Sequence, residues 1–410
     1  MVVEILDLWL NRSRNLPLHI SFVGDVNWML DYSYWEPIFE RAKTCSERWE
    51  TLRLEMSRKA WCHFFEGFRC PPSLKGIRLV APAGEDREWE LDSPAEFIRP
   101  TLHGLEELHI QNVSWQEVDI AWENLIVFEA GPWDFFGFEL LLSHAPRLKK
   151  CRILYMGSVF HSPTVHSHLE DLELWNSSSI SLEDVIRQFT FPSLKRLVYR
   201  PGTSRFSSQV PPVGARMDRL QSFVVRSQCR LIELEIHIPF KTTADLAKVL
   251  AHLPSLECLT LSTDRRYRDN SALWLSDISF AEHLKFSVLS RLLPQLKVFR
   301  IEGKRAFSWD ALIAFLKPPH KHVTSKRNTC VHIQFASYLP SQERSENYID
   351  RDVVLRLKRR ERKWKGAVSL DIKHRDSGED WMQASLDYHE QASSISTRVD
   401  FSGPTLCTSS

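Results

Sequence analysis

Apolar residues spaced at positions i, i+3 and i+5 recur along most of this chain, and this spacing limits its possible folds more than any other feature. In the stretch from His168 to Trp175 the three apolar positions are Leu169, Leu172 and Leu174. Eleven copies of the spacing begin at Trp49, Leu74, Leu105, Leu125, Leu148, Leu169, Leu194, Leu220, Leu231, Leu256 and Leu296. The first seven copies start 20 to 31 residues apart. Such a period indicates a stack of similar units, each a short strand followed by a return segment.

The segments between the copies carry the signals of helices and corners. Ser57, Thr243 and Ser308 can each cap a short helix. Proline stands just before several strands, as at Pro192 and Pro254, where it ends a helix without removing a hydrogen bond from the sheet. We therefore predict an α/β leucine-rich-repeat solenoid, a horseshoe with parallel strands on its concave face and mostly helices on its convex face.

This solenoid is expected to span residues 1–375. Residues 1–48 are interpreted as a capping helix and strand, and 262–290 as an inserted loop and helix. The last part, 376–410, is expected to hold the end of a helix and a tail that is disordered from Ala392 onward, because Ser, Thr and Gly dominate there.

Two neighbouring copies, at Leu220 and Leu231, start only 11 residues apart. A strand, a helix and a return do not fit in that length, so we predict two strands joined by a coil at Arg226 to Arg230. The weaker pattern after Ile301 predicts a strand at 331–335, a helix at 348–364 and a closing strand at 366–372.

Composition excludes several classes of function. The chain has 53 Lys and Arg against 52 Asp and Glu, so no excess charge points to nucleic acid or to a membrane. The acidic N-terminus and the lack of a long apolar run predict a cytoplasmic or nuclear protein, and the eight scattered cysteines are expected to be reduced. No catalytic motif occurs, and 14 glycines are few for phosphate-binding loops. We expect a monomer that is not an enzyme and needs no cofactor.

The positions between the apolar ones are expected to face outward from the concave sheet. The candidate partner-binding residues there are Lys150, Arg152, Asp171, Glu173, Trp175, Arg196, Arg200, Glu233, Glu235 and His237. Along successive strands their charge alternates from basic to acidic, which permits two interpretations. The charges can pair with one another across the strands, or they can set the register of a bound peptide. Trp175 separates the two, because an aromatic residue on a charged face is a plausible anchor unless the following loop covers its ring.

Two groups of residues partly resemble metal ligands. They are His161, His166 and His168, and His320, His322 and Cys330. Neither group has the spacing of a zinc site, so no metal is expected. The basic run from Arg356 to Lys365 is interpreted either as a nuclear-import or anion-binding patch or as the exposed face of a helix that packs Val353, Val354 and Leu357 inward.

Four segments resemble the F-box/leucine-rich-repeat proteins that basidiomycete fungi carry in large numbers. These segments are the opening Leu8 to Leu18, Arg48 to Leu52, Asp245 to Leu261, and Leu292 to Ile301. In that family an N-terminal F-box binds the Skp-type adaptor of a cullin-RING ubiquitin ligase, and the repeats select a protein substrate.

The resemblance therefore implies a protein-interaction scaffold that recognises a ligase substrate. The chain departs from the family because it has no Leu-Pro-x-Glu-Ile/Val-Leu start with a downstream Val-Cys-Arg-x-Trp. Adaptor binding is assigned to no residue here, and it is expected only if an F-box exists upstream. The alternative is a repeat-only interaction module without a link to ubiquitin; an extracellular receptor is disfavoured by the missing signal peptide and the free cysteines.

Overall fold

The structure is a computed structural model, and it describes most of the chain. The described residues are 2–24, 35–66, 68, 70–82, 101–102, 104–113, 119–131, 135–154, 163–176, 187–201, 217–236, 243–262, 286–303, 308–316, 329–335, 348–364, 368–374 and 377–399. They belong to two compact units. Unit 1 is Met1–Pro211 with Val225–Cys229, and unit 2 is Pro212–Val224 with Arg230–Ser410.

Unit 1 is built on a parallel sheet. Its strands, in the order in which they pair, are β1 (Leu18–Val23), β2 (Trp49–Glu55), β3 (Gly76–Val80), β5 (Glu107–Gln111), β7 (Val127–Gly131), β8 (Lys150–Leu154), β10 (Asp171–Asn176) and β12 (Arg196–Pro201). Equivalent positions of successive copies lie side by side. Leu172, for example, pairs with Cys151 on β8 and with Leu197 on β12. This regular register confirms the predicted solenoid of parallel strands.

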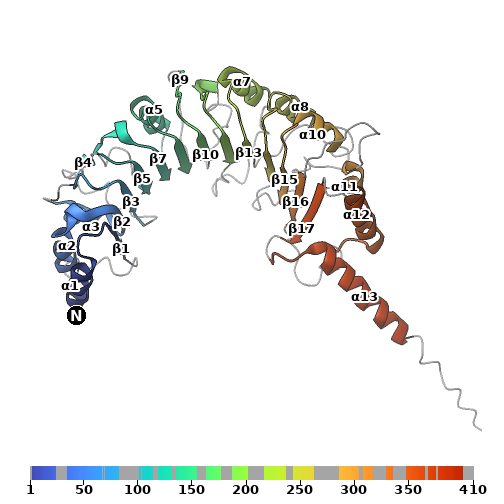
Figure 1. The fold of residues 1–410 in the computed structure, drawn as a ribbon, viewed down its shortest axis with the longest axis horizontal. Helices are drawn as coiled ribbons and strands as arrows, with labels where there is room; N and C mark the ends of the chain where they lie inside the picture. Colours follow the sequence, from blue (N-terminus) through green and yellow to red (C-terminus); the bar gives the residue numbers. More distant parts are fainter. Residues whose placement is uncertain are drawn as a thin grey trace, which may run out of the picture. The chain divides into compact units, whose positions relative to one another are not determined.

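The return segments of unit 1 lie on the other side of its strands (Figure 1). They hold α2 (Glu36–Lys43), η3 (Ser46–Arg48), α3 (Arg58–Phe65), η5 (Trp122–Asn124) and α5 (Phe135–His144), and a further helix, α1 (Val2–Ser13), precedes β1. Two short strand pairs also occur there, β4 (Thr101–Leu102) with β6 (Asp119–Ile120) and β9 (Thr164–Val165) with β11 (Phe189–Thr190). The predicted cap on α3 is present, because Ser57 Oγ accepts a 3.3 Å hydrogen bond from the Ala60 amide.

Unit 2 continues the same alternation of helix and strand. Its elements are α7 (Met217–Ser227, whose last residues belong to unit 1), β13 (Glu233–Ile236), α8 (Thr243–Leu250), β14 (Cys258–Ser262), α10 (Phe286–Leu292), β15 (Val298–Gly303), α11 (Trp309–Phe315), β16 (Thr329–Phe335), α12 (Arg351–Lys363), β17 (Val368–His374) and α13 (Trp381–Val399). Strands β13 to β17 pair in parallel and in chain order. Ser308 caps α11 by accepting a 3.1 Å hydrogen bond from the Ala311 amide, as predicted.

The predicted repeat copy at Leu220 is wrong, because residues 217–227 form helix α7. Leu220 and Phe223 are buried in either pattern, since a helix and the repeat strand both bury positions i and i+3. The third apolar position distinguishes a helix from a repeat strand, since it is i+4 in the helix and i+5 in the repeat. Val224, at i+4, is only 4% exposed, whereas Val225, at i+5, is 52% exposed. One strand, β13, therefore follows a helix here, in place of two strands joined by a coil.

The core lies between the strands and the return segments. The i, i+3 and i+5 residues of the remaining copies are almost all buried, as Leu169, Leu172 and Leu174 illustrate. The Cys151 thiol occupies such a position, and burial raises its pKa far above the ordinary value. The free thiols are Cys45, Cys70, Cys151, Cys229, Cys258 and Cys330.

The C-terminal helix is longer than the sequence suggests. Residues from Ala392 onward were expected to be disordered, yet α13 extends to Val399. Trp381, Met382 and Ser385 are buried at its start and anchor the helix, which then continues along the chain. Residues 400–410, most of the predicted insertion 262–290 and residues 237–242 lie outside the described residues.

Candidate binding surface on the strand face

Three rows of side chains cross the outward face of the sheet in unit 1, because equivalent positions of successive copies are in register. The rows lie at positions i+2, i+4 and i+6 of each copy. We call the i+4 row the middle row and the i+6 row, near the carboxyl ends of the strands, the end row. The middle row contains Arg53, Arg78, His109, Glu129, Arg152 and Glu173. The end row contains Glu55, Val80, Gln111, Gly131, Leu154, Trp175 and Arg200.

Each carboxylate of the middle row lies close to basic side chains from two neighbouring strands. Glu129 lies 3.1 Å from His109 Nδ1 and 3.4 Å from Arg152 Nη1. Glu173 lies 3.5 Å from Arg152 Nε and 3.6 Å from Arg196 Nη1. The charges therefore pair across neighbouring strands, which is the first of the two arrangements that the alternating pattern permits.

Glu55 of the end row shows the electrostatic effect of such sharing. It lies 2.8 Å from Arg53 and 3.3 Å from Arg78. The hydrogen bond from Arg53 is the main cause that lowers the pKa of the Glu55 carboxyl below its ordinary value, and Arg78 contributes in the same direction. These side chains are partly exposed, so each pair stabilises the fold only modestly.

Trp175 is held by residues from three strands. Its indole N–H donates a 2.5 Å hydrogen bond to Glu173 Oε1 on the same strand. The guanidinium carbon of Arg152, on β8, lies 5.2 Å from the ring centroid, and that of Arg200, on β12, lies 4.7 Å from it. Because β8 and β12 flank β10 on opposite sides, the ring is fixed between two cations. Its side chain is half-buried, and the predicted loop after it, residues 177–186, lies outside the described part of the chain.

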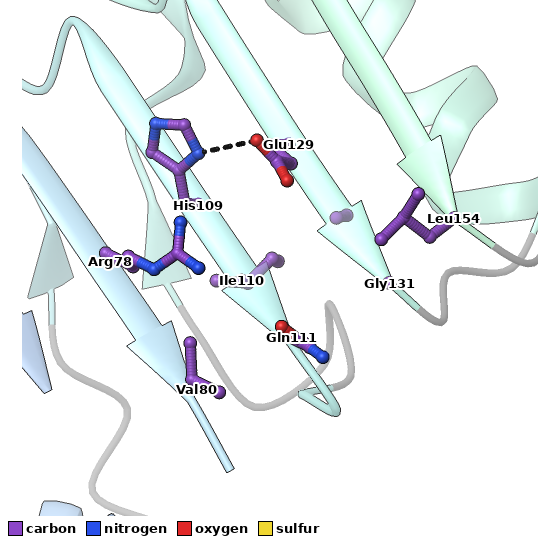
Figure 2. A pocket seen from close by; sticks show the side chains of 9 residues that line it. Arg78, Val80, His109, Ile110, Gln111, Glu129, Gly131 and Leu154 are labelled. Atoms are coloured by element: carbon purple, nitrogen blue, oxygen red, sulfur yellow. Dashed lines mark hydrogen bonds and ion pairs between the residues drawn. The ribbon is translucent and has the colours of Figure 1, made fainter. Parts of the chain in front are cut away.

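A hollow opens in the end row at Gly131 (Figure 2). Its volume is about 10 Å³, which is room for about one water molecule. Its lining residues are Arg78, Val80, His109, Ile110, Gln111, Glu129, Ala130, Gly131 and Leu154. Glycine is required at its floor, because a Cβ on Gly131 would lie 2.5 Å from Leu154 Cβ. The hollow thus combines apolar walls at Val80 and Leu154 with polar groups from the middle row.

Seven of the ten candidate residues belong to this surface. Lys150 pairs in register with Asp171, which lies 2.9 Å from Arg196 Nη1. Arg152, Glu173, Trp175 and Arg200 form the cluster already described. Glu233 and Glu235 lie on β13 in unit 2, and His237 is outside the described residues.

Sequence reasoning missed two features of this face. The first is the hollow, whose only signal is a glycine, Gly131, at an outward i+6 position. The second is a row of ion pairs at i+1. Among the described residues this row contains Glu50 with Lys75 at 2.7 Å, Glu170 with Lys195 at 2.6 Å and, in unit 2, Glu257 with Lys297 at 2.5 Å. The hydrogen bond from Lys75 lowers the pKa of Glu50, and that from Lys195 lowers the pKa of Glu170.

The histidine groups have a structural role where they are described. His166 is buried, its Nδ1 accepts a 3.1 Å hydrogen bond from the Leu169 amide, and its Nε2 lies 2.9 Å from the Ala145 carbonyl oxygen, to which it donates. Both ring nitrogens are therefore occupied by backbone groups. Within the described ranges, no group of three or more potential metal ligands occurs.

The part of the basic run from Arg356 to Lys363 lies on helix α12. Val353, Val354 and Leu357 are buried, as predicted, and Arg356 Nη1 lies 2.7 Å from Asp310 Oδ1. The run therefore covers the exposed face of this helix, and a role in nuclear import stays a prediction. None of the helices in the described part of the chain is both long and apolar enough to span a membrane.

Comparison with known proteins gives little beyond the structure. No protein-family model matches the sequence, and no curated protein matches it. Among solved structures, one similar chain comes from the "Crystal structure of TLR13-ssRNA13 complex", at 13% identity and a TM-score of 0.34. The match covers 80% of this chain, which spans 39% of that chain. The class of this protein is thus defined by its own coordinates, as an α/β leucine-rich-repeat solenoid.

Proposed function

We propose that this protein is an interaction scaffold that binds a protein partner on the strand face of unit 1. The observation that carries the proposal is the pairing of a rigid aromatic residue with a hollow along the end row. Trp175 is held by Glu173, Arg152 and Arg200. Leu154, which pairs in register with Trp175, also lines the hollow at Gly131. A preorganised aromatic residue near a surface hollow is typical of the residues that dominate binding energy.

The paired charges of the middle row favour the end row as the source of affinity. A partner gains little from a charge whose counter-ion is already in place, because the existing pair must first be broken. An apolar side chain of the partner can cover Val80, Leu154 and Trp175 without breaking an ion pair. The middle row then fixes the register of the bound segment, which combines the two arrangements that the sequence permits.

The test is site-specific photo-crosslinking in cells that express the protein. Gln111 is exposed and lines the hollow, whereas Val165, on β9, is exposed on the opposite side of unit 1. A photoreactive residue at position 111 should capture a specific protein, and the same residue at position 165 should not. Capture of the same protein from both positions, or from position 165 alone, would contradict binding on the strand face.

We further propose that the partner is a substrate of a cullin-RING ubiquitin ligase and that the solenoid is the substrate-recognition region of an F-box-type receptor. The support is the resemblance of Leu8 to Leu18, Arg48 to Leu52, Asp245 to Leu261 and Leu292 to Ile301 to that family. The alternative is a repeat-only interaction module. Reading the gene upstream of Met1 for an F-box, and testing whether its full product binds purified Skp-type adaptor, separates them. Failure to bind adaptor would leave only the repeat-only module.

We propose a cytoplasmic or nuclear location, on the basis of the free cysteines. The run from Arg356 to Lys365 offers the exposed basic face that nuclear import requires. A fluorescent fusion should lose its nuclear signal when Arg359 and Arg360 are changed to Ala. An unchanged distribution would mean that the basic run serves only as the exposed face of α12 and not as an import signal.

A further inference from the structure

Helix α12, on the helix side of unit 2, carries a high density of positive charge (Figure 1). Seven of its 13 residues are Lys or Arg and two are Asp or Glu, which gives the helix a formal charge of +5 in a chain whose total is +1. Val353, Val354 and Leu357 pack inward. The exposed residues form what we call the α12 basic face, which contains Arg351, Asp352, Leu355, Arg356, Arg359, Arg362 and Lys363.

Most cations of this helix have no counter-ion among the described residues. Arg356 has one, since its Nη1 lies 2.7 Å from Asp310 Oδ1 on α11. The carboxylate of Glu361 is turned toward the sheet, where it accepts a 2.9 Å hydrogen bond from the Leu370 amide on β17. The cations that form no ion pair within the described part of the chain are Arg351, Lys358, Arg359, Arg360, Arg362 and Lys363. The charges of the strand face in unit 1, by contrast, pair across strands.

This density of like charge destabilises the helix itself. Arg359 follows Arg356 by three residues and precedes Arg362 and Lys363 by three and four, and like charges at these spacings oppose helix formation. The helix dipole favours cations in the last turn, but Arg351 lies in the first turn, where a cation is disfavoured. Intrahelical electrostatics therefore does not account for the α12 basic face, whereas an anionic partner does.

The residues of this face favour an acidic protein segment over other anions. A helix that binds a membrane surface needs an apolar stripe, and the exposed apolar residue of α12 is Leu355 alone, at 41% exposure. Sites for single-stranded nucleic acid stack bases on aromatic rings, but Trp364, at the end of α12, is half-buried and donates its indole N–H to the Leu316 carbonyl oxygen at 3.1 Å. Guanidinium groups match carboxylates in geometry and charge, and Leu355 can contact one apolar side chain among them.

From this charge complementarity we propose that the α12 basic face binds an acidic helix of a protein partner, with Leu355 at the centre of the contact. Arg351 and Arg359 each lie four residues from Leu355, about 6 Å along the helix axis on opposite sides. A matching helix carries an apolar residue with Asp or Glu four residues before and after it, because the same spacing applies to the partner. The contact goes beyond the strand face of unit 1 and does not rest on it.

Fluorescence anisotropy of a labelled peptide with the whole chain tests the proposal. The probe is an alanine-based helix of about 20 residues with a central Leu and Glu at the two flanking positions, and its match carries Gln in place of Glu. The Glu peptide should bind about tenfold more tightly than the Gln peptide at low salt. Arg359→Glu should weaken its binding about fivefold. Arg291→Glu, at an exposed site on α10 of the same unit, is the matched control and should leave binding unchanged. Equal affinity for the two peptides, or equal losses in the two variants, would overturn the proposal.

A charge exchange tests the position of Leu355 at the centre. Two further peptides each carry Lys in place of one flanking Glu, and one of the two should bind Arg359→Glu about fivefold more tightly than it binds the parent. Recovery with neither peptide would exclude this register and overturn the proposal.

Phosphatidylserine vesicles and a polyuridine RNA, measured in competition with the Glu peptide, test the choice of partner. Neither should bind more tightly than the peptide, and tighter binding of either would overturn the assignment to a protein. Urea denaturation shows that the fold is retained, and Arg359→Glu should have an equal or higher midpoint because it removes like-charge neighbours. Binding between purified components is independent of nuclear import and of the strand face.

Discussion

The indole N–H of Trp175 donates a 2.5 Å hydrogen bond to Oε1 of Glu173, two residues earlier on the same face of β10. The same carboxylate lies within 3.6 Å of guanidinium nitrogens of Arg152 and Arg196. Glu173 therefore joins the aromatic residue to the ion pairs of the middle row. Glu173 positions the candidate anchor, and Trp175 offers the apolar surface.

Glu173→Ala should destabilise the fold by about 1 to 3 kcal/mol, because it leaves the half-buried Arg152 and Arg196 without their shared carboxylate and the indole N–H without its acceptor. Glu173→Gln is the matched variant and should cost less, since the amide oxygen still accepts from Trp175. Urea denaturation gives both values. Equal losses for the two variants would show that the hydrogen bond to Trp175 contributes nothing.

Gly131→Ala should destabilise the protein by about 1 to 3 kcal/mol, because the new Cβ overlaps Leu154 Cβ and strands β7 and β8 must shift. The denaturation midpoint measures the change. In a Leu154→Gly background the same substitution should cost much less, since the overlapping atom is gone. Equal costs in both backgrounds would place the strain elsewhere.

The two neighbouring valines on α7 test the correction of the repeat at Leu220. Val224→Ala removes buried methyl groups and should cost about 1 to 2 kcal/mol. Val225→Ala makes the same chemical change at an exposed site and should stay within about 0.5 kcal/mol of the parent. The reverse order of the two values is the result expected if this segment were a repeat strand.

Stability should fall with acid through His166. Burial is the main cause that lowers the pKa of its imidazole from the ordinary 6.5, so the unfolded chain binds a proton more readily than the folded one. The contribution is therefore complete above pH 6.5 and is lost as the pH falls below it. Urea midpoints measured on both sides of pH 6.5 should drop less for His166→Gln than for the parent. If the urea midpoints of the parent and of His166→Gln fell equally with pH, His166 would not be the cause of the acid-dependent loss of stability.

The sequence allowed most of the fold to be predicted because the repeat spacing is reinforced at each copy. Leu169, Leu172 and Leu174 place β10, and the same spacing places β2, β3, β5, β7, β8, β12, β13, β14 and β15 but fails at Leu220. That error arose because positions i and i+3 are buried in a helix as well as in a repeat strand, so a single residue, Val224 or Val225, carries the distinction.

The candidate site was predicted less completely. The outward positions and the charge alternation follow from the spacing, but the contacts of Trp175 do not. Arg200 reaches it from the same position of the next copy, whereas Arg152 reaches it from a different position of the preceding copy. Such diagonal contacts depend on side-chain conformation. The hollow depends on the missing side chain of Gly131, which the apolar pattern does not record.

The most direct test of the account is the affinity of the purified partner, identified by crosslinking from position 111, for variants of the strand face. Trp175→Ala and Leu154→Asp should each raise the dissociation constant by at least about tenfold, or about 1.4 kcal/mol. Val165→Asp, on the opposite side of unit 1, should leave it unchanged. Wild-type affinity in both strand-face variants, or a loss in the Val165 variant alone, would contradict binding through this surface.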